Sequence, residues 1–150
     1  MLSALDIAKW IIKFCEQHGD PITNLKLQKL LYYAQAWNLA LHDEPVFDET
    51  IEAWVYGPVV PQVYRAFKSF GAEPLLIETE EPELPDAVVD HLKEVMEVFG
   101  GYSSYQLEIM THRESPWLRA RGDLAPDEPC TATILHDDMK EYYRKLESQD

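Results

Sequence analysis

Apolar residues recur at helical spacing through most of the chain. In the first segment they are Ala4, Ile7, Ala8, Ile11, Phe14 and Cys15. Steps of three and four residues are typical of a helix with one buried face. Ser3 can cap this helix, and Gly19-Asp20-Pro21 ends it. Similar patterns predict helices at about 61–70, 88–99, 103–111 and 133–146, with a short helical turn from Trp117.

The segment from about 24 to 42 differs from these helices because it is apolar on nearly every side. No charged residue occurs between Lys29 and His42. A helix of this kind is usually buried at the centre of a fold. Its polar strip includes Gln28, Gln35 and Asn38, which form either a solvated edge or a set of amides that bind a partner's backbone.

Two short segments after this helix favour extended structure. They are Val46–Phe47 and Ile51–Tyr56, and the second is rich in β-forming residues. Residues 72–85 combine five glutamates with three prolines, which predicts a mobile acidic loop. We therefore expect one domain over residues 1–150. It should be a mainly α bundle of about six helices around the 24–42 helix, with a small two-stranded extended segment at about 46–56.

Charge restricts the classes of partner. The net charge is −14, and residues 72–98 hold nine acidic residues and a single lysine. Phosphate contacts need clustered Lys or Arg, so the composition argues against direct binding of nucleic acid, and against anionic membranes for the same reason. No signal peptide or long apolar run is present, and two distant cysteines make no disulfide framework. We expect a soluble, cytoplasmic protein.

No motif for catalysis, metal binding or cofactor binding occurs in the chain. The five histidines form no HxxxH or HExxH pair, although zinc sites need three or four ligands at short spacings. We therefore expect no catalytic residue, no metal and no cofactor. His112-Arg113-Glu114 is the most catalytic-looking tripeptide. Its ordinary interpretation is a helix C-terminus with a favourable cation, and its alternative is a hydrolase that uses His112 and Glu114.

Aromatic and basic residues near the extended segment suit a contact surface. Trp54 and Tyr56 alternate on one side of that segment, and Tyr64 and Arg65 follow it. Tyr, Trp and Arg dominate the energetics of protein interfaces, while core packing is the alternative role for each ring. The full candidate partner-binding set is Gln28, Gln35, Asn38, Trp54, Tyr56, Tyr64, Arg65, His112 and Trp117.

Three blocks of this sequence resemble a known family. They are LQKLLYYAQ at 27–35, EAWVYGPVVP at 52–61 with Val63-Tyr64, and Leu107 followed by THRESPW at 111–117. In order and spacing they are similar to the Panacea domain of the SocA-like antitoxins, which also occurs in phage-associated proteins. The likeness spans residues 3–146.

The resemblance implies a small helical antitoxin domain that neutralises a protein toxin by direct binding. In one branch of the family, the protein is a proteolytic adaptor that delivers its toxin to a ClpXP-type protease. An adaptor needs a second surface, and the acidic 72–98 stretch is our candidate for it. A third possibility is an acidic, phage-associated inhibitor of a nucleic-acid-binding protein.

Overall fold

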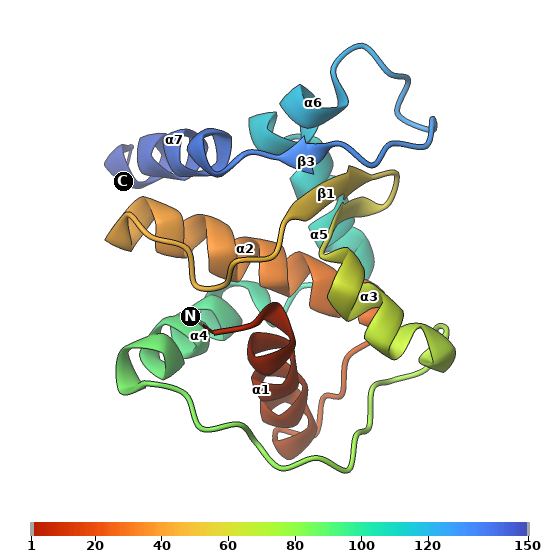
Figure 1. Cartoon of the computed structure of the whole chain (residues 1–150), viewed down its shortest axis with the longest axis vertical. Helices are drawn as coiled ribbons and strands as arrows, with labels where there is room; N and C mark the ends of the chain where they lie inside the picture. Colours follow the sequence, from red (N-terminus) through yellow and green to blue (C-terminus); the bar gives the residue numbers. More distant parts are fainter. Residues whose placement is uncertain (1, 150) are drawn as a thin grey trace.

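The computed structural model describes residues 2–149 and is organised around one central helix (Figure 1). Helix α2 (Asn24–His42) has 15 buried residues out of 19. It contacts α1 (Ala4–Gln17), α4 (Asp86–Phe99), α5 (Ser104–His112) and α7 (His136–Ser148). In Figure 1, α7 lies on one side of α2, and α1 and α4 lie on the other. The predicted mainly α fold with a buried central helix is confirmed.

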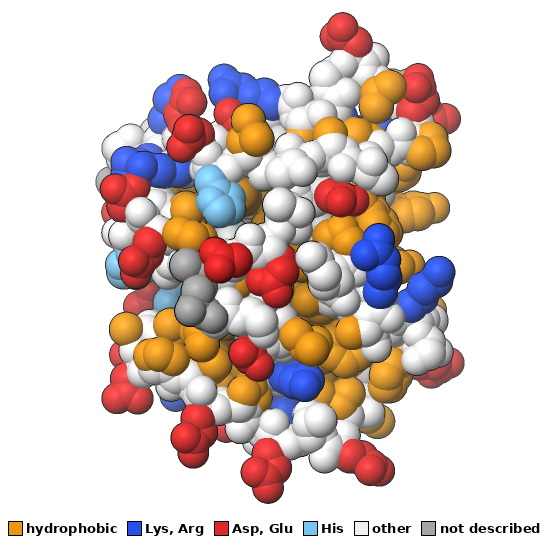
Figure 2. Space-filling view, in the orientation of Figure 1, with side chains coloured by type: hydrophobic (Ala, Val, Ile, Leu, Met, Phe, Trp, Pro, Cys, Tyr) orange, Lys and Arg blue, Asp and Glu red, His pale blue; other side chains and the backbone are white. Residues whose placement is uncertain are grey.

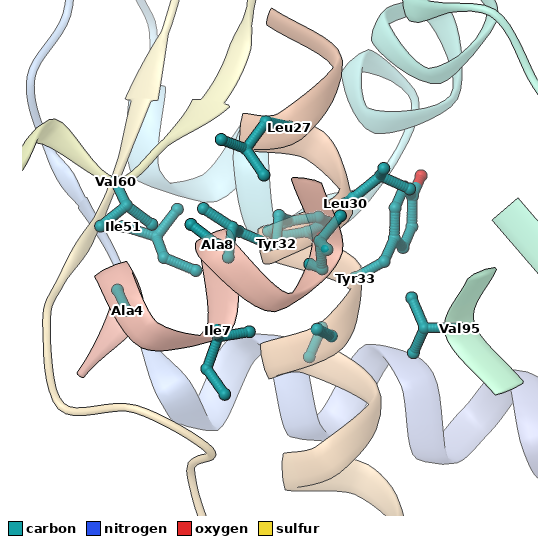
Figure 3. Packing of buried hydrophobic residues seen from close by; sticks show 14 of the residues in the cluster. Ala4, Ile7, Ala8, Leu27, Leu30, Tyr32, Tyr33, Ile51, Val60 and Val95 are labelled. Atoms are coloured by element: carbon teal, nitrogen blue, oxygen red, sulfur yellow. The ribbon is translucent and has the colours of Figure 1, made fainter. Parts of the chain in front are cut away.

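The amphipathic helices place their apolar faces on α2. Figure 3 shows Ala4, Ile7 and Ala8 of α1 directed toward the core that Leu27 and Leu30 of α2 help to form. A side chain caps the N-terminus of three of the helices. It accepts a hydrogen bond there because the first backbone N–H groups of a helix lack acceptors within the helix. The capping residues are Ser3, Thr23 and Ser103, the last in a complete capping box with Gln106.

A small three-stranded antiparallel sheet covers one end of α2. It has the order β2-β1-β3, with β1 at Ile51–Trp54, β2 at Gly57–Val59 and β3 at Thr133–Ile134. The predicted extended segment is confirmed at Ile51–Trp54, but its other details were wrong. Val46–Phe47 forms no strand, and the strand that pairs with β1 is Gly57–Val59 instead. Thr133 was expected to start the last helix, but it pairs with Glu52 in β3, and α7 begins at His136.

The remaining helices are short, and the acidic segment is irregular. They are α3 (Pro61–Phe67), which continues into a 3₁₀ turn at Lys68–Phe70, and α6 (Ser115–Arg121). The 72–85 segment crosses beneath α1 in Figure 1. The Leu75 N–H donates to the Ile22 carbonyl at 2.7 Å, and Lys13 Nζ donates to the Ile77 carbonyl at 3.1 Å. These contacts attach the first half of the segment to α1 and to the residues before α2.

Two buried glutamines of α2 explain why the chain after it needs no regular strand. The Gln35 amide donates to the Phe47 carbonyl at 2.8 Å and accepts from the Val46 N–H at 2.8 Å. Gln28 Oε1 accepts from the Val60 N–H at 2.9 Å. A side-chain amide carries the same donor and acceptor as a peptide group, so Gln35 satisfies the Val46–Phe47 backbone that a neighbouring strand would otherwise satisfy.

Replacing Gln35 with leucine should therefore destabilise the fold. The change keeps the volume but leaves the Val46 N–H and the Phe47 carbonyl buried without partners, which costs about 3 kcal/mol. Urea unfolding followed by tryptophan fluorescence measures the loss. Gln62→Leu makes the same chemical change at an exposed position of α3 and should stay within about 0.5 kcal/mol of the wild type. Equal midpoints for the two variants would contradict this role of Gln35.

Candidate functional site

The candidate site is the hairpin formed by β1 and β2 (residues 51–59, hereafter the hairpin). Trp54 pairs with Gly57 at its end, so Val55 and Tyr56 form the turn. Tyr56 is 61% exposed and has no hydrogen-bonded side-chain partner among the described residues. A large, rigid aromatic ring is thus presented to solvent at the tip of a hairpin.

Three further candidates, Trp54, Tyr64 and Arg65, lie in the hairpin or close to it, and each is at least partly exposed. Trp54 is half-buried, and its ring meets Tyr64 of α3 edge-on, with the centroids 5.1 Å apart. Trp54 Nε1 donates to Glu52 Oε1 at 2.8 Å. Arg65 follows Tyr64 and is exposed. The structure therefore places the rings of Trp54 and Tyr64 in contact, with Tyr56 two residues after Trp54 and Arg65 directly after Tyr64.

Helix α6 supports the hairpin from behind. Trp117 is buried, and its Nε1 donates to the Trp54 carbonyl at 2.9 Å. Arg121, also buried, donates from its guanidinium to the Ala53 carbonyl at 3.0 Å and lies over the Trp117 ring. His112 stacks on Trp117 with centroids 4.1 Å apart. Among the predicted contact residues, Trp117 and His112 therefore support the hairpin in this structure.

Helix α2 supports the hairpin turn through Lys29. Gly57 has a φ of 116°, which side chains rarely adopt, and a Cβ there would lie 3.2 Å from Thr111 Oγ1 and 3.3 Å from Lys29 Cε. The positive φ therefore requires glycine, and the two side chains leave little room for a Cβ. Lys29 is fully buried, its Nζ donates to the Leu25 carbonyl at 3.2 Å, and burial lowers its pKa to about 8.

The predicted amide strip is used inside the fold. Gln28 and Gln35 are completely buried, and Asn38 is nearly so. Asn38 Nδ2 donates to the Glu44 carbonyl at 2.7 Å, while the two glutamines bind the backbone at Val60 and at Val46–Phe47. Both interpretations of this strip were therefore wrong, because the amides are buried rather than solvated and the backbone that they bind is the chain's own.

A buried carboxyl lies at the N-terminus of α6, and the sequence did not predict its environment. Glu114 is surrounded by three tyrosine hydroxyls, from Tyr32 and Tyr33 of α2 and Tyr143 of α7. Tyr33 donates to Oε2 at 2.9 Å, and Tyr32 donates to Oε1 at 3.3 Å. The usable signal was the number of buried tyrosines, since a buried phenol needs a hydrogen-bond partner. We call these four residues the Glu114 cluster.

Burial controls the titration of the Glu114 cluster. It raises the pKa of Glu114 to about 7, although the three hydroxyls favour the charged form. Burial also raises the pKa of each of the three tyrosines. No hydrogen bond joins Glu114 to His112 among the described residues, so the structure does not assemble the pair that the hydrolase alternative requires.

No metal or membrane feature accompanies the hairpin. Residues 2–149 contain no group of three or more His, Cys, Asp or Glu side chains placed to hold a metal ion. Within the same residues, no helix has the length and apolar character needed to cross a membrane.

Replacing Glu114 with glutamine should change how stability depends on pH. An ordinary glutamate titrates near 4.5 and the folded Glu114 near 7. Its stabilising contribution is therefore complete below pH 4.5 and is lost as the pH rises through 7. Between about pH 5.5 and 8 the loss amounts to about 2 kcal/mol, and Glu114→Gln should not show it.

Urea unfolding at several pH values measures this difference. Burial lowers the pKa of His91 and of His112, which makes stability rise with pH, but both proteins share these histidines. The difference between wild type and variant therefore isolates Glu114. Parallel pH profiles would contradict the assignment.

Two comparisons with known proteins point to the same family. The family model described as "Antitoxin SocA-like, Panacea domain" matches residues 27–118, which include most of α2, the hairpin and the start of α6. The chain is 31% identical to Antitoxin SocA of Caulobacter vibrioides (strain NA1000 / CB15N) over 110 residues. That alignment covers 65% of this chain and 58% of the relative, so the chain spans less than two thirds of the relative's length. No solved structure matches. The chain belongs to the SocA-like antitoxin family and carries its Panacea domain.

Proposed function

We propose that this chain is an antitoxin that neutralises a protein toxin by binding it directly in the cytoplasm, with the hairpin as the contact. Membership of the SocA-like family supports the antitoxin role. The observation that carries the choice of surface is Tyr56, which is exposed at the tip of a hairpin whose backbone is fixed from several sides.

The support behind the hairpin favours tight binding. Ordering a flexible loop on association costs free energy. Hydrogen bonds from Trp117 and Arg121 already hold β1, and β3 pairs with its other edge. The turn is therefore ordered before a partner arrives. Trp54, Tyr64 and Arg65 provide residues of the types that dominate interface energetics beside it.

Replacing Tyr56 with alanine should abolish protection while leaving the fold intact. The ring is exposed, so stability should change by less than about 0.5 kcal/mol. The assay is growth of a bacterial host that expresses the neighbouring open reading frame with or without this protein, beside a thermal melt of each variant. Tyr105→Ala is the matched control, because Tyr105 of α5 is 68% exposed and lies outside the hairpin. Protection by Tyr56→Ala equal to that of Tyr105→Ala would contradict the proposal.

The adaptor role is a second candidate, and one observation favours it. The acidic side chains Glu78, Glu80, Glu81 and Glu83 are exposed and take no part in an ion pair among the described residues. Figure 2 shows acidic side chains spaced along the lower edge of the molecule, where Figure 1 places the 72–85 segment. This surface is separate from the hairpin.

Changing these four glutamates to lysine should separate the two roles. An adaptor would still bind its toxin but would no longer cause its degradation, because only the protease-facing surface has changed. Toxin half-life measured with and without ClpX, together with a toxin pull-down, gives both readouts. Degradation that continues unchanged in the variant would show that these glutamates are only a solvated surface.

A further inference from the structure

A groove between α2 and α4 has no assigned role. It has a volume of about 280 Å³ and is lined by Trp37, Leu41, His91, Val95, Val98 and Phe99, with Glu94 at its edge. We propose that this groove binds an amphipathic helix of a partner protein whose apolar face is flanked by Lys or Arg. The proposal concerns a surface other than the hairpin and does not depend on it.

The two walls of the groove present apolar side chains that the core does not use. Leu92 and Val95 of α4 are buried in the core, whereas Val98 on the same helix is 61% exposed. Leu41 lies one turn after Trp37 on α2 and is 42% exposed. Side chains spaced by one helical turn form ridges between which the ridge of another helix packs. The groove thus has the surface of a helix–helix contact without the second helix.

An unsatisfied donor adds to this picture. Trp37 Nε1 is buried and has no acceptor among the described residues, although the indole N–H of a buried tryptophan usually finds one. Trp37 also lines the groove. A side chain that lines the groove thus carries a donor that has no acceptor within residues 2–149.

The acidic residues beside the groove favour a partner helix that carries basic residues. Asp90, Glu94 and Glu97 are exposed along α4, and none of them takes part in an ion pair within residues 2–149. The only histidine in the wall, His91, is held neutral because burial lowers its pKa. Lys or Arg on the partner would complement this row of acids.

The same charge disfavours other occupants. A second copy of this chain also carries −14 and would place like charges together, and an anionic lipid surface would be repelled. A volume of about 280 Å³ is near the lower end of the roughly 300–1,000 Å³ typical of small-molecule sites. Insertion of a few apolar side chains from a helix fits both the size and the shape.

A synthetic helix tests the proposal without any toxin. The probe is a peptide of about five turns with Leu at i, i+3, i+4 and i+7 and Lys at the flanking positions, titrated to about 1 mM into the full chain. Two-dimensional ¹H–¹⁵N NMR follows the Trp37 indole N–H signal. We expect this signal to shift with the Leu41 and Val98 amides. A peptide with the same leucines and Glu in place of Lys should leave all three unchanged.

Two variants that add the same negative charge distinguish direct contact with the groove from general electrostatic attraction of the peptide. Val98→Glu places a carboxylate in the groove wall, while Leu76→Glu places one on the acidic segment, where Leu76 is 58% exposed. Both raise the overall attraction for the basic peptide equally. Val98→Glu should weaken binding at least about tenfold, and Leu76→Glu should not weaken it.

Three results would overturn the proposal. They are a Lys peptide that leaves the Trp37 indole signal unmoved, equal affinity of Val98→Glu and wild type, and a dimer of the free chain that Val98→Glu dissociates in sedimentation analysis. The last would assign the groove to a second copy. No toxin enters this assay. A negative result here therefore leaves the outcome of the Tyr56 growth test unaffected, and a negative growth test leaves the peptide-binding result unaffected.

Discussion

The fold depends on α2 burying polar side chains that must each find a partner inside the protein. An amide left unpaired in a core costs about 1–3 kcal/mol, so Gln28 and Gln35 constrain whatever chain lies against them. Both glutamines bind the backbone of the segment that follows the helix, at Val46–Phe47 and at Val60. A helix that is apolar nearly all round would stabilise many arrangements of its neighbours, because hydrophobic contact has little directionality. The buried amides remove that freedom and fix where the hairpin begins.

The three sequence blocks that resemble the Panacea domain meet in space at this hairpin. Lys29 of the first block and Thr111 of the third enclose Gly57 of the second. Tyr32 and Tyr33 of the first block bind Glu114 of the third. The blocks are therefore parts of one network, which links α2, the hairpin and the start of α6. The Glu114 carboxyl takes part in a contact inside the fold. Its pKa is raised because this network is buried away from water.

The sequence predicted the helices well because their signals are local. Periodic apolar residues predicted α1, α4 and α5 to within about two residues, with a capping serine before α1 and α5 and a glycine after α1 and α4. The strands depended on distant residues. Val46–Phe47 has the composition of a strand, but Gln35 occupies its backbone, whereas Thr133–Ile134 becomes a strand only because β1 lies beside it. The Glu114 cluster was missed for the same reason, since Tyr143 is 29 residues from Glu114. For the candidate site, the sequence indicated Trp54 and Tyr64 together but could not show that Trp117 lies behind them.

The two ends of α2 differ in what they leave exposed, and this difference bears on function. Near its start, hydrogen bonds from Gln28, Trp117 and Arg121 hold the backbone of the hairpin and of the residue after it, so Tyr56 projects from an ordered support. About 18 Å further along the helix, Trp37 keeps an unpaired donor and Leu41 and Val98 keep apolar surface. Larger side chains that filled this groove would bury more apolar surface and so stabilise the isolated chain. Leaving it open beside a row of unpaired acids is the arrangement expected when another protein supplies the missing face.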